Sequence, residues 1–145
     1  MRRSTLILIL VAAALAAPAP ASATAASRGI TITTRASSYG PVLFDGRGRA
    51  LYAFTRDSRN HSRCFGACAR AWPVAFTRGR PRAGSGVRSR LLGSIRRPGG
   101  GRQATYGGRP LYYYVDDPTG QIRCQNVVEF GGTWLVLRGS GALVR

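Results

Sequence analysis

The sequence predicts a mainly β fold in which two tandem, hairpin-rich repeats pack together as one small domain. Apolar and branched residues occur in short runs, and glycine-rich turns separate many of these runs. One phrase also occurs twice: GRALYAFTRD at 48–57 returns sixty positions later as GRPLYYYVDD at 108–117. Each copy alone has too little apolar surface to form a stable core. We therefore expect the two repeats to bury their apolar faces against each other.

Residues 1–23 have the pattern of a secretory signal peptide. A basic start precedes an uncharged apolar run at 6–17, and small residues follow it, with Ala21-Ser22-Ala23 as the expected cleavage site. This run is too short to span a bilayer comfortably, and no later segment is apolar enough to do so. No cysteine lies between the run and the cleavage site. We therefore expect an exported chain, extracellular or in the periplasm or cell envelope, that has no lipid anchor on an N-terminal cysteine.

The first half of the exported chain is expected to contain a strand, a hairpin and at most one short helix. Residues 24–39 form a polar arm and a first strand, because ITITTR at 30–35 alternates branched and polar side chains. Repeat 1 covers 40–77 and opens with a hairpin whose turn is DGRG, a strong turn signal between apolar arms. The small residues of 64–72 favour a short helix, which Pro73 would end.

The second half is expected to begin after a Gly/Pro/Arg-rich connection at 78–90. Repeat 2 covers 91–138 and holds a strand and two hairpins, one around GGR at 107–109 and one around the glycine pair of EFGGTW. Residues 139–145 form a tail.

The aromatic residues divide between the two faces of the repeated strand. Successive side chains of a strand point to opposite faces, so Tyr52 and Tyr112 are expected in the core, together with Trp72 and Trp134. Tyr113 then lies on the opposite face and is the candidate for an exposed contact with a ligand such as a sugar or a base.

The repeat motif supports a resemblance to a known family. The phrase Tyr-x4-Asp occurs as Tyr52…Asp57 and Tyr112…Asp117, accompanied by CFGACARAWP, QATYGGRPLYYYVDD and FGGTW. Over about residues 40–138, the chain resembles the bacterial family described as a secreted repeat of unknown function, predicted lipoproteins with a Tyr-x-aromatic-x-x-Asp motif. The resemblance implies an exported envelope protein with no established biochemical activity. The chain departs from the family pattern at Cys124, and it lacks the lipid-anchoring cysteine that many members carry.

The three cysteines leave two disulfide pairings open. A Cys64–Cys68 bridge would close a very small loop, and a regular helix there would give poor geometry for it. A bridge from either residue to Cys124 would join the two halves, and closing a loop of about sixty residues stabilises by roughly 4 kcal/mol. The resemblance implies the local pair, whereas the additional cysteine favours the long one. We favour a bridge that includes Cys124.

The same cysteines and the single histidine carry an alternative function. His61, Cys64, Cys68 and Cys124 are ligands that copper or zinc accepts, and nearby arginines would lower a thiol pKa for redox chemistry. Their spacing matches no zinc finger or ribbon, and disulfides are favoured in an exported chain. A structural disulfide without a cofactor is the preferred interpretation.

The positive charge of the chain has two interpretations. The formal net charge is +17, and the chain contains 22 arginines and no lysine. This excess indicates affinity for an anionic envelope polymer or lipid headgroup, or it reflects GC-rich codon usage. The arginines are scattered along the sequence, which argues against a specific nucleic-acid site.

No catalytic constellation is recognisable in the sequence. Asp57 and Asp117 occupy turn positions and are better explained as turn formers than as a glycosidase pair. The chain has one histidine and no Gly-x-Ser-x-Gly or phosphate-binding glycine loop. We expect a non-enzymatic envelope protein that binds an anionic envelope component or a protein partner, with a redox or metal-handling protein as the alternative.

Overall fold

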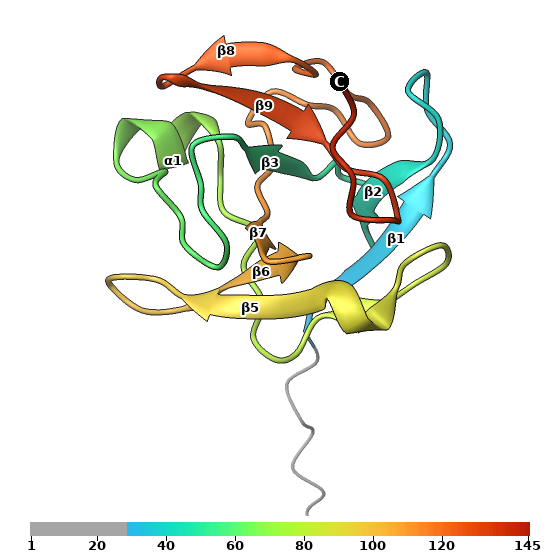
Figure 1. The fold of residues 1–145 in the computed structure, drawn as a ribbon, viewed down its shortest axis with the longest axis horizontal. Coiled ribbons are helices and arrows are strands. Elements are labelled where there is room, and N and C mark those ends of the chain that lie inside the picture. Colours follow the sequence, from blue (N-terminus) through green and yellow to red (C-terminus); the bar gives the residue numbers. More distant parts are fainter. Residues whose placement is uncertain (1–28) are drawn as a thin grey trace, which may run out of the picture.

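A computed structural model describes residues 29–145, which form three small sheets of three strands each and one short α-helix (Figure 1). The mainly β fold that the sequence predicts is confirmed. The predicted signal peptide, 1–23, lies outside the described residues.

The first sheet has the strand order β2–β1–β4. The alternating segment forms β1 (Thr31–Arg35), which pairs antiparallel with β2 (Val42–Asp45). The DGRG turn follows β2, and Gly48 within it has a φ of 87°, a conformation that glycine adopts without steric cost. β4 (Arg82–Ala83) comes from the Gly/Pro/Arg-rich connection and pairs in parallel with β1. The connection is therefore fastened to the first strand.

The second sheet joins the two repeats and has the order β3–β9–β8. β8 (Val127–Glu129) and β9 (Gly132–Val136) form the hairpin predicted at the end of repeat 2, with Gly131 in its turn at a φ of 76°. β9 also pairs antiparallel with β3 (Tyr52–Phe54), which belongs to repeat 1. The first copy of the repeated phrase thus obtains its strand partner from the other half of the chain.

The third sheet lies within repeat 2 and has the order β5–β6–β7. β5 (Leu92–Arg96) pairs with β6 (Arg102–Tyr106), which turns back into β7 (Arg109–Pro110). Gly107 and Gly108 form this turn with φ values of 58° and 77°. They are the glycines of the predicted GGR turn.

The one α-helix is α1 (Ala67–Ala71), inside the segment where the sequence predicts it. Gly66 precedes it with a φ of 56°, so the chain turns sharply before the helix begins. The helix ends at Trp72, next to Pro73, as expected from the conformational restriction that proline imposes. A turn of 3-10 helix, η1 (Ser89–Leu91), leads into β5.

The two copies of the repeated phrase meet at the centre of the molecule. Tyr52 and Tyr112 are antiparallel partners, and each backbone N–H donates to the other's carbonyl oxygen, at 2.9 and 3.0 Å. Tyr52 also pairs with Val136 of repeat 2, and Tyr112 pairs with Val74 of repeat 1. An approximate twofold axis therefore passes between the two tyrosines, and the repeats are intertwined. Figure 1 shows β3 between β9 and β7, in the middle of the fold.

The central strands are buried on both faces. Tyr52 and Tyr112 belong to one hydrophobic cluster, which also holds the two tryptophans and the cysteines of the helical segment. Leu51 and Leu111 point the other way into a second cluster, packed against β1, β5 and β6. Because both faces are covered, the repeated phrase reads as a nearly continuous apolar run.

Candidate functional site

The repeat motif forms hydrogen bonds that cross between the repeats. The hydroxyl of Tyr52 donates to Asp117 Oδ2 at 2.5 Å, and the hydroxyl of Tyr112 donates to Asp57 Oδ2 at 2.7 Å. The other oxygen of each carboxylate accepts a backbone N–H six residues further along, so Asp57 closes its own loop as well. Each tyrosine is thus bound by the aspartate of the other repeat.

Burial raises the pKa of all four side chains in the crossed pairs. It raises the pKa of Tyr52 and of Tyr112 well above the ordinary range, and the neighbouring carboxylates raise both further. The hydroxyls therefore stay protonated and act as donors. Burial also raises the pKa of Asp57 and of Asp117, against the lowering effect of the hydrogen bonds that they accept. The pairs connect the repeats through neutral hydroxyl donors and carboxylate acceptors.

An aromatic column lies between the crossed pairs and has the same approximate symmetry. The rings of Trp72 and Trp134 are stacked 3.9 Å apart with an interplanar angle of 1°. Phe54 packs on the outer face of Trp134 at 4.2 Å, and Tyr114 packs on Trp72 at 4.8 Å. Tyr52 meets Trp72 edge-on at 5.2 Å, while Tyr112 meets Trp134 edge-on at 5.1 Å. The two tryptophans at the centre of the column are fully buried, so the column belongs to the core.

The disulfide joins Cys64 to Cys68, and Cys124 is free, so the predicted bridge to Cys124 is wrong. Residues 64–66 are not helical, because the chain turns at Gly66 before the helix begins. The Cα atoms of Cys64 and Cys68 consequently lie 5.2 Å apart, within the usual range for a disulfide. Cys124 packs against the first hydrophobic cluster, and burial raises the pKa of its thiol, which disfavours the reactive thiolate.

The metal and redox alternative receives no support from this arrangement. Two of its four residues, Cys64 and Cys68, are joined as a disulfide and present no thiolates. His61 is exposed on the loop that precedes them. Within the part of the chain that the structure describes, no three His, Cys, Asp or Glu side chains come together as a metal site.

Tyr113 is buried, so the prediction of an exposed contact there is wrong. Its exposed fraction is 6%, and its hydroxyl donates to Asp45 Oδ2 at 3.0 Å. The second hydrophobic cluster covers the strand face that we expected to be open. Burial raises the pKa of Tyr113 above the ordinary range, and the Asp45 charge raises it further, so this hydroxyl also remains a donor.

A cavity lined by arginines lies beside Tyr113. We call it the arginine-lined cavity; its volume is about 470 Å³. It lies where β1 begins, between the turn after β2 and the segment that leads to β4. Four arginines line it, against one acidic residue; these are Arg47, Arg49, Arg78 and Arg82, with Asp45. Arg82 donates to the hydroxyl of Thr31 at 2.8 Å, which fixes it at the rim.

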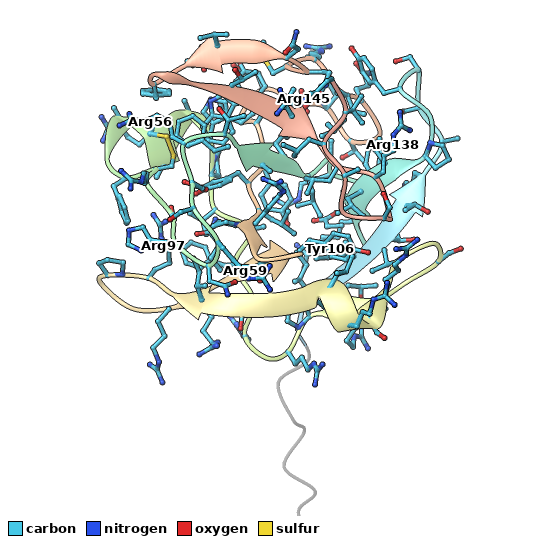
Figure 2. All side chains as sticks on the ribbon, in the orientation of Figure 1. Arg56, Arg59, Arg97, Tyr106, Arg138 and Arg145 are labelled. Atoms are coloured by element: carbon cyan, nitrogen blue, oxygen red, sulfur yellow. A yellow bond between two sulfur atoms is a disulfide. The ribbon has the colours of Figure 1, made fainter. Side chains whose placement is uncertain are left out.

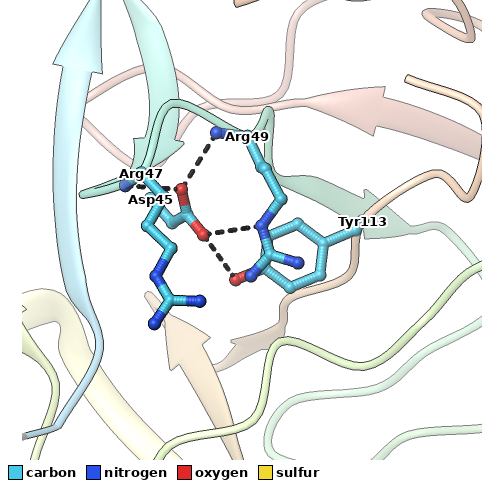
Figure 3. Close-up of polar contacts among 4 residues, drawn as sticks. All are labelled: Asp45, Arg47, Arg49 and Tyr113. Atoms are coloured by element: carbon cyan, nitrogen blue, oxygen red, sulfur yellow. Dashed lines mark hydrogen bonds and ion pairs between the residues drawn. The ribbon is translucent and has the colours of Figure 1, made fainter. Parts of the chain in front are cut away.

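Asp45 organises one wall of this cavity, as Figure 3 shows. Its Oδ1 accepts the backbone N–H groups of Arg47 and Arg49, both at 2.9 Å, and its Oδ2 accepts Arg49 Nε at 3.0 Å and the Tyr113 hydroxyl. The Arg49 guanidinium lies over the Tyr113 ring, 3.7 Å from its centroid. The charge of Asp45, which is 2% exposed, is therefore matched internally.

Arg47 is oriented differently from Arg49. Its side chain extends away from the Asp45 carboxylate in Figure 3, and its guanidinium has no hydrogen-bond or ion-pair partner among residues 29–145. The guanidinium groups of Arg49 and Arg82 are held in place beside it. A guanidinium without an internal partner can bind two oxygens of an oxyanion such as a phosphate or carboxylate.

The remaining arginines are distributed over the molecule. Figure 2 shows Arg56 and Arg97 on one side of the molecule and Arg138 and Arg145 toward the other. Part of this charge is used internally: Arg97 donates to the Cys64 carbonyl at 2.7 Å and lies over the Phe65 ring. The arginine-lined cavity is therefore a local concentration within a generally basic surface.

The fold and its centre define a β protein built from two intertwined repeats. A family model described as a secreted repeat of unknown function matches residues 33–76 and 93–138. The chain belongs to this family of secreted proteins, which confirms the resemblance drawn from its motifs. Searches of curated proteins and of solved structures each gave no match. No helix described in the structure is long and apolar enough to cross a membrane.

Two features of the centre and the cavity were not recognised in the sequence. The stacked tryptophans are equivalent in the two repeats, but they are sixty-two residues apart, so a comparison at the fixed spacing of sixty misses them. Asp45 and Arg49 were not singled out either. An aspartate that opens a DGRG turn, with an arginine four residues later, was the available signal for their ion pair.

Proposed function

We propose that the chain is exported through its N-terminal signal and acts as a non-enzymatic module that binds a phosphate-bearing polymer of the cell envelope. The observation that carries this proposal is the arginine-lined cavity, in which four arginines surround a single, internally matched carboxylate. The non-enzymatic role is supported by the motif aspartates, which are occupied by hydrogen bonds between the repeats.

Phosphate fits the cavity by charge and by geometry. Arginine presents a planar fork of donors that matches two oxygens of a phosphate group. Arg49 is held by Asp45 and Tyr113, so little of its freedom has to be lost on binding. Arg47 supplies an unmatched charge beside it. A phosphodiester polymer carries such phosphate groups at regular intervals. A protein partner would instead have to present an acidic side chain at this position.

The test is binding of the exported chain to an immobilised polymer of glycerol phosphate, measured over a range of NaCl concentrations. We expect affinity to fall as salt rises, because added ions screen charges beyond about 10 Å at 0.1 M. The double variant Arg47→Ala/Arg82→Ala should bind about tenfold more weakly, since two partly exposed ion pairs contribute up to about 1 kcal/mol each.

A charge-matched control separates the cavity from the general positive surface. Arg70→Ala/Arg145→Ala removes the same charge from exposed positions outside the cavity. If the two double variants weaken binding to the polymer equally, the cavity is not a specific site and the polymer binds through the general positive charge of the surface. This is the outcome expected if the arginines reflect codon usage. Binding to an acidic peptide but not to the polymer would instead identify a protein partner and overturn the proposal.

A further inference from the structure

A second cavity lies at the position in repeat 2 that corresponds to the arginine-lined cavity of repeat 1, and Arg59 and Asn60 of repeat 1 complete its lining. The first cavity lies where β1 begins, beside the turn after β2. The second, with a volume of about 300 Å³, lies where β5 begins, beside the turn after β6. We call it the repeat-2 cavity. Gly48 and Gly108 occupy equivalent places in the two turns, sixty residues apart, with φ values of 87° and 77°.

The repeat-2 cavity is basic and has no acidic residue among those that line it. Arg59 and Arg90 line it, and Asn60 and Thr105 add polar groups. Thr105 occupies the position of Asp45 in repeat 1, sixty residues earlier. The carboxylate that engages Arg49 in the first cavity therefore has no counterpart among the residues that line this one.

Arg59 is fixed over the turn of the repeat-2 cavity. Its Cγ lies so close to Gly108 that a Cβ on this glycine would be 2.7 Å from it, and its Nη1 donates weakly to the Gly107 carbonyl at 3.4 Å. Arg90 is exposed, and its guanidinium has no hydrogen bond or ion pair within the described range 29–145. Arg59 thus lies against the turn, and Arg90 is available to contact a ligand.

An adjoining cavity of about 250 Å³ extends this basic region. It shares Arg59, Gly107 and Gly108 with the repeat-2 cavity and adds Arg109, the equivalent of Arg49. Asp57 also lines it, but the two oxygens of this carboxylate accept hydrogen bonds from Tyr112 and from the backbone of Arg63. Asp57 therefore differs from Asp45, because its hydrogen-bond partners are neutral groups and not a guanidinium.

We propose that the repeat-2 cavity is a second site for phosphate-type oxyanions, so that each chain binds two such groups, at equivalent turns of the two repeats. The choice of phosphate as the ligand rests on the proposed function. The location of the site rests on the residues that line the repeat-2 cavity. Two sites on one chain would let it hold a linear phosphate polymer at two points, which raises the overall affinity without new contacts.

The experiment is isothermal titration calorimetry of the exported chain with inorganic tripolyphosphate at low salt. We expect two tripolyphosphate ions per chain. The double variant Arg59→Gln/Arg90→Gln should bind one, with the affinity of the remaining site within about twofold of its original value. The charge-matched variant Arg70→Gln/Arg145→Gln should still bind two. Figure 2 shows Arg145 on the β8–β9 side of the molecule, away from Arg59. Thermal unfolding of each variant checks that it is folded.

The outcomes separate this inference from the proposed function. An unchanged stoichiometry in Arg59→Gln/Arg90→Gln overturns the second site, whether the wild-type chain binds one ion or two. The variant Arg47→Gln/Arg82→Gln tests the first cavity in the same titration. If it still binds two ions while the repeat-2 variant binds one, the second site stands and the first cavity is not the one that binds phosphate. If the control loses a site as well, the binding is general charge attraction and the second site is refuted.

Discussion

Removing one hydroxyl from either crossed pair should measure how strongly the repeats hold each other. In Tyr112→Phe the ring keeps its edge-on contact with Trp134, but Asp57 loses its 2.7 Å hydrogen bond. A hydrogen bond to a charged group contributes about 1.5–3 kcal/mol. Asp57 is half-buried, so water replaces part of the loss, and we take about 2 kcal/mol for it. Ser62 is buried and loses its 2.7 Å contact with the same hydroxyl, which adds about 1 kcal/mol.

The equivalent change in the other pair should cost less. Tyr52→Phe removes the hydrogen bond to Asp117 and has no serine contact, so we expect a loss of about 2 kcal/mol in the free energy of unfolding. For a domain of this size, that corresponds to a decrease in Tm of about 8 °C. The measurement is denaturant unfolding under non-reducing conditions. Tyr39→Phe is the control, because the Tyr39 hydroxyl makes no hydrogen bond among the described residues. If Tyr52→Phe and Tyr112→Phe lose no more than Tyr39→Phe, the crossed pairs do not hold the repeats together.

Two further predictions concern acidity and the cysteines. Burial raises the pKa of Asp57 and Asp117 above the ordinary 3.8, so the stability that they contribute is present below pH 3.8 and is lost as the pH rises through the folded pKa. The variant Asp57→Asn/Asp117→Asn should therefore become more stable relative to wild type over that rise. A constant difference in the free energy of unfolding between pH 3.5 and 7 would contradict this. Replacing Cys64 and Cys68 by serine should lower the free energy of unfolding by about 2 kcal/mol, the value for a loop this short, whereas Cys124→Ser should leave it within about 0.5 kcal/mol. Thiol titration of the denatured, unreduced chain should find the single thiol of Cys124, and a count of zero or three would be inconsistent with the local bridge.

Local patterns were sufficient for the turns and for most strands. The turns after β2, β6 and β8 each contain a glycine with positive φ, a property of the residue that does not depend on distant contacts. The DGRG turn does not form the expected hairpin, because β2 pairs with β1 and β3 with β9, and a single bridge, Phe44 to Ala50, joins its two arms. The helix between 64 and 72 was likewise predictable from its small residues and from Pro73. Repetition at a spacing of sixty was enough to predict two packed halves, because neither half can bury a core alone.

The pairing between distant segments was not predictable from those patterns. Tyr113 was expected to be exposed because a strand alternates, but the second hydrophobic cluster covers its face as well. The local disulfide was disfavoured on the assumption of a helix from Cys64, whereas the turn at Gly66 delays the helix. The arginine-lined cavity forms only because β4 pairs with β1 and brings Arg82 to the turn at Arg47, a contact that no local signal encodes.

The intertwining of the repeats makes the molecule equivalent to a strand-swapped homodimer whose two subunits are fused. Tyr52 finds its strand partner and its carboxylate in the second repeat, and Tyr112 finds both in the first. In a dimer of separate chains, such an exchange would make stability fall on dilution. Here each repeat carries its partner sixty residues away on the same chain, so folding is independent of protein concentration. For a member of a secreted family, this means that dilution outside the cell does not unfold it.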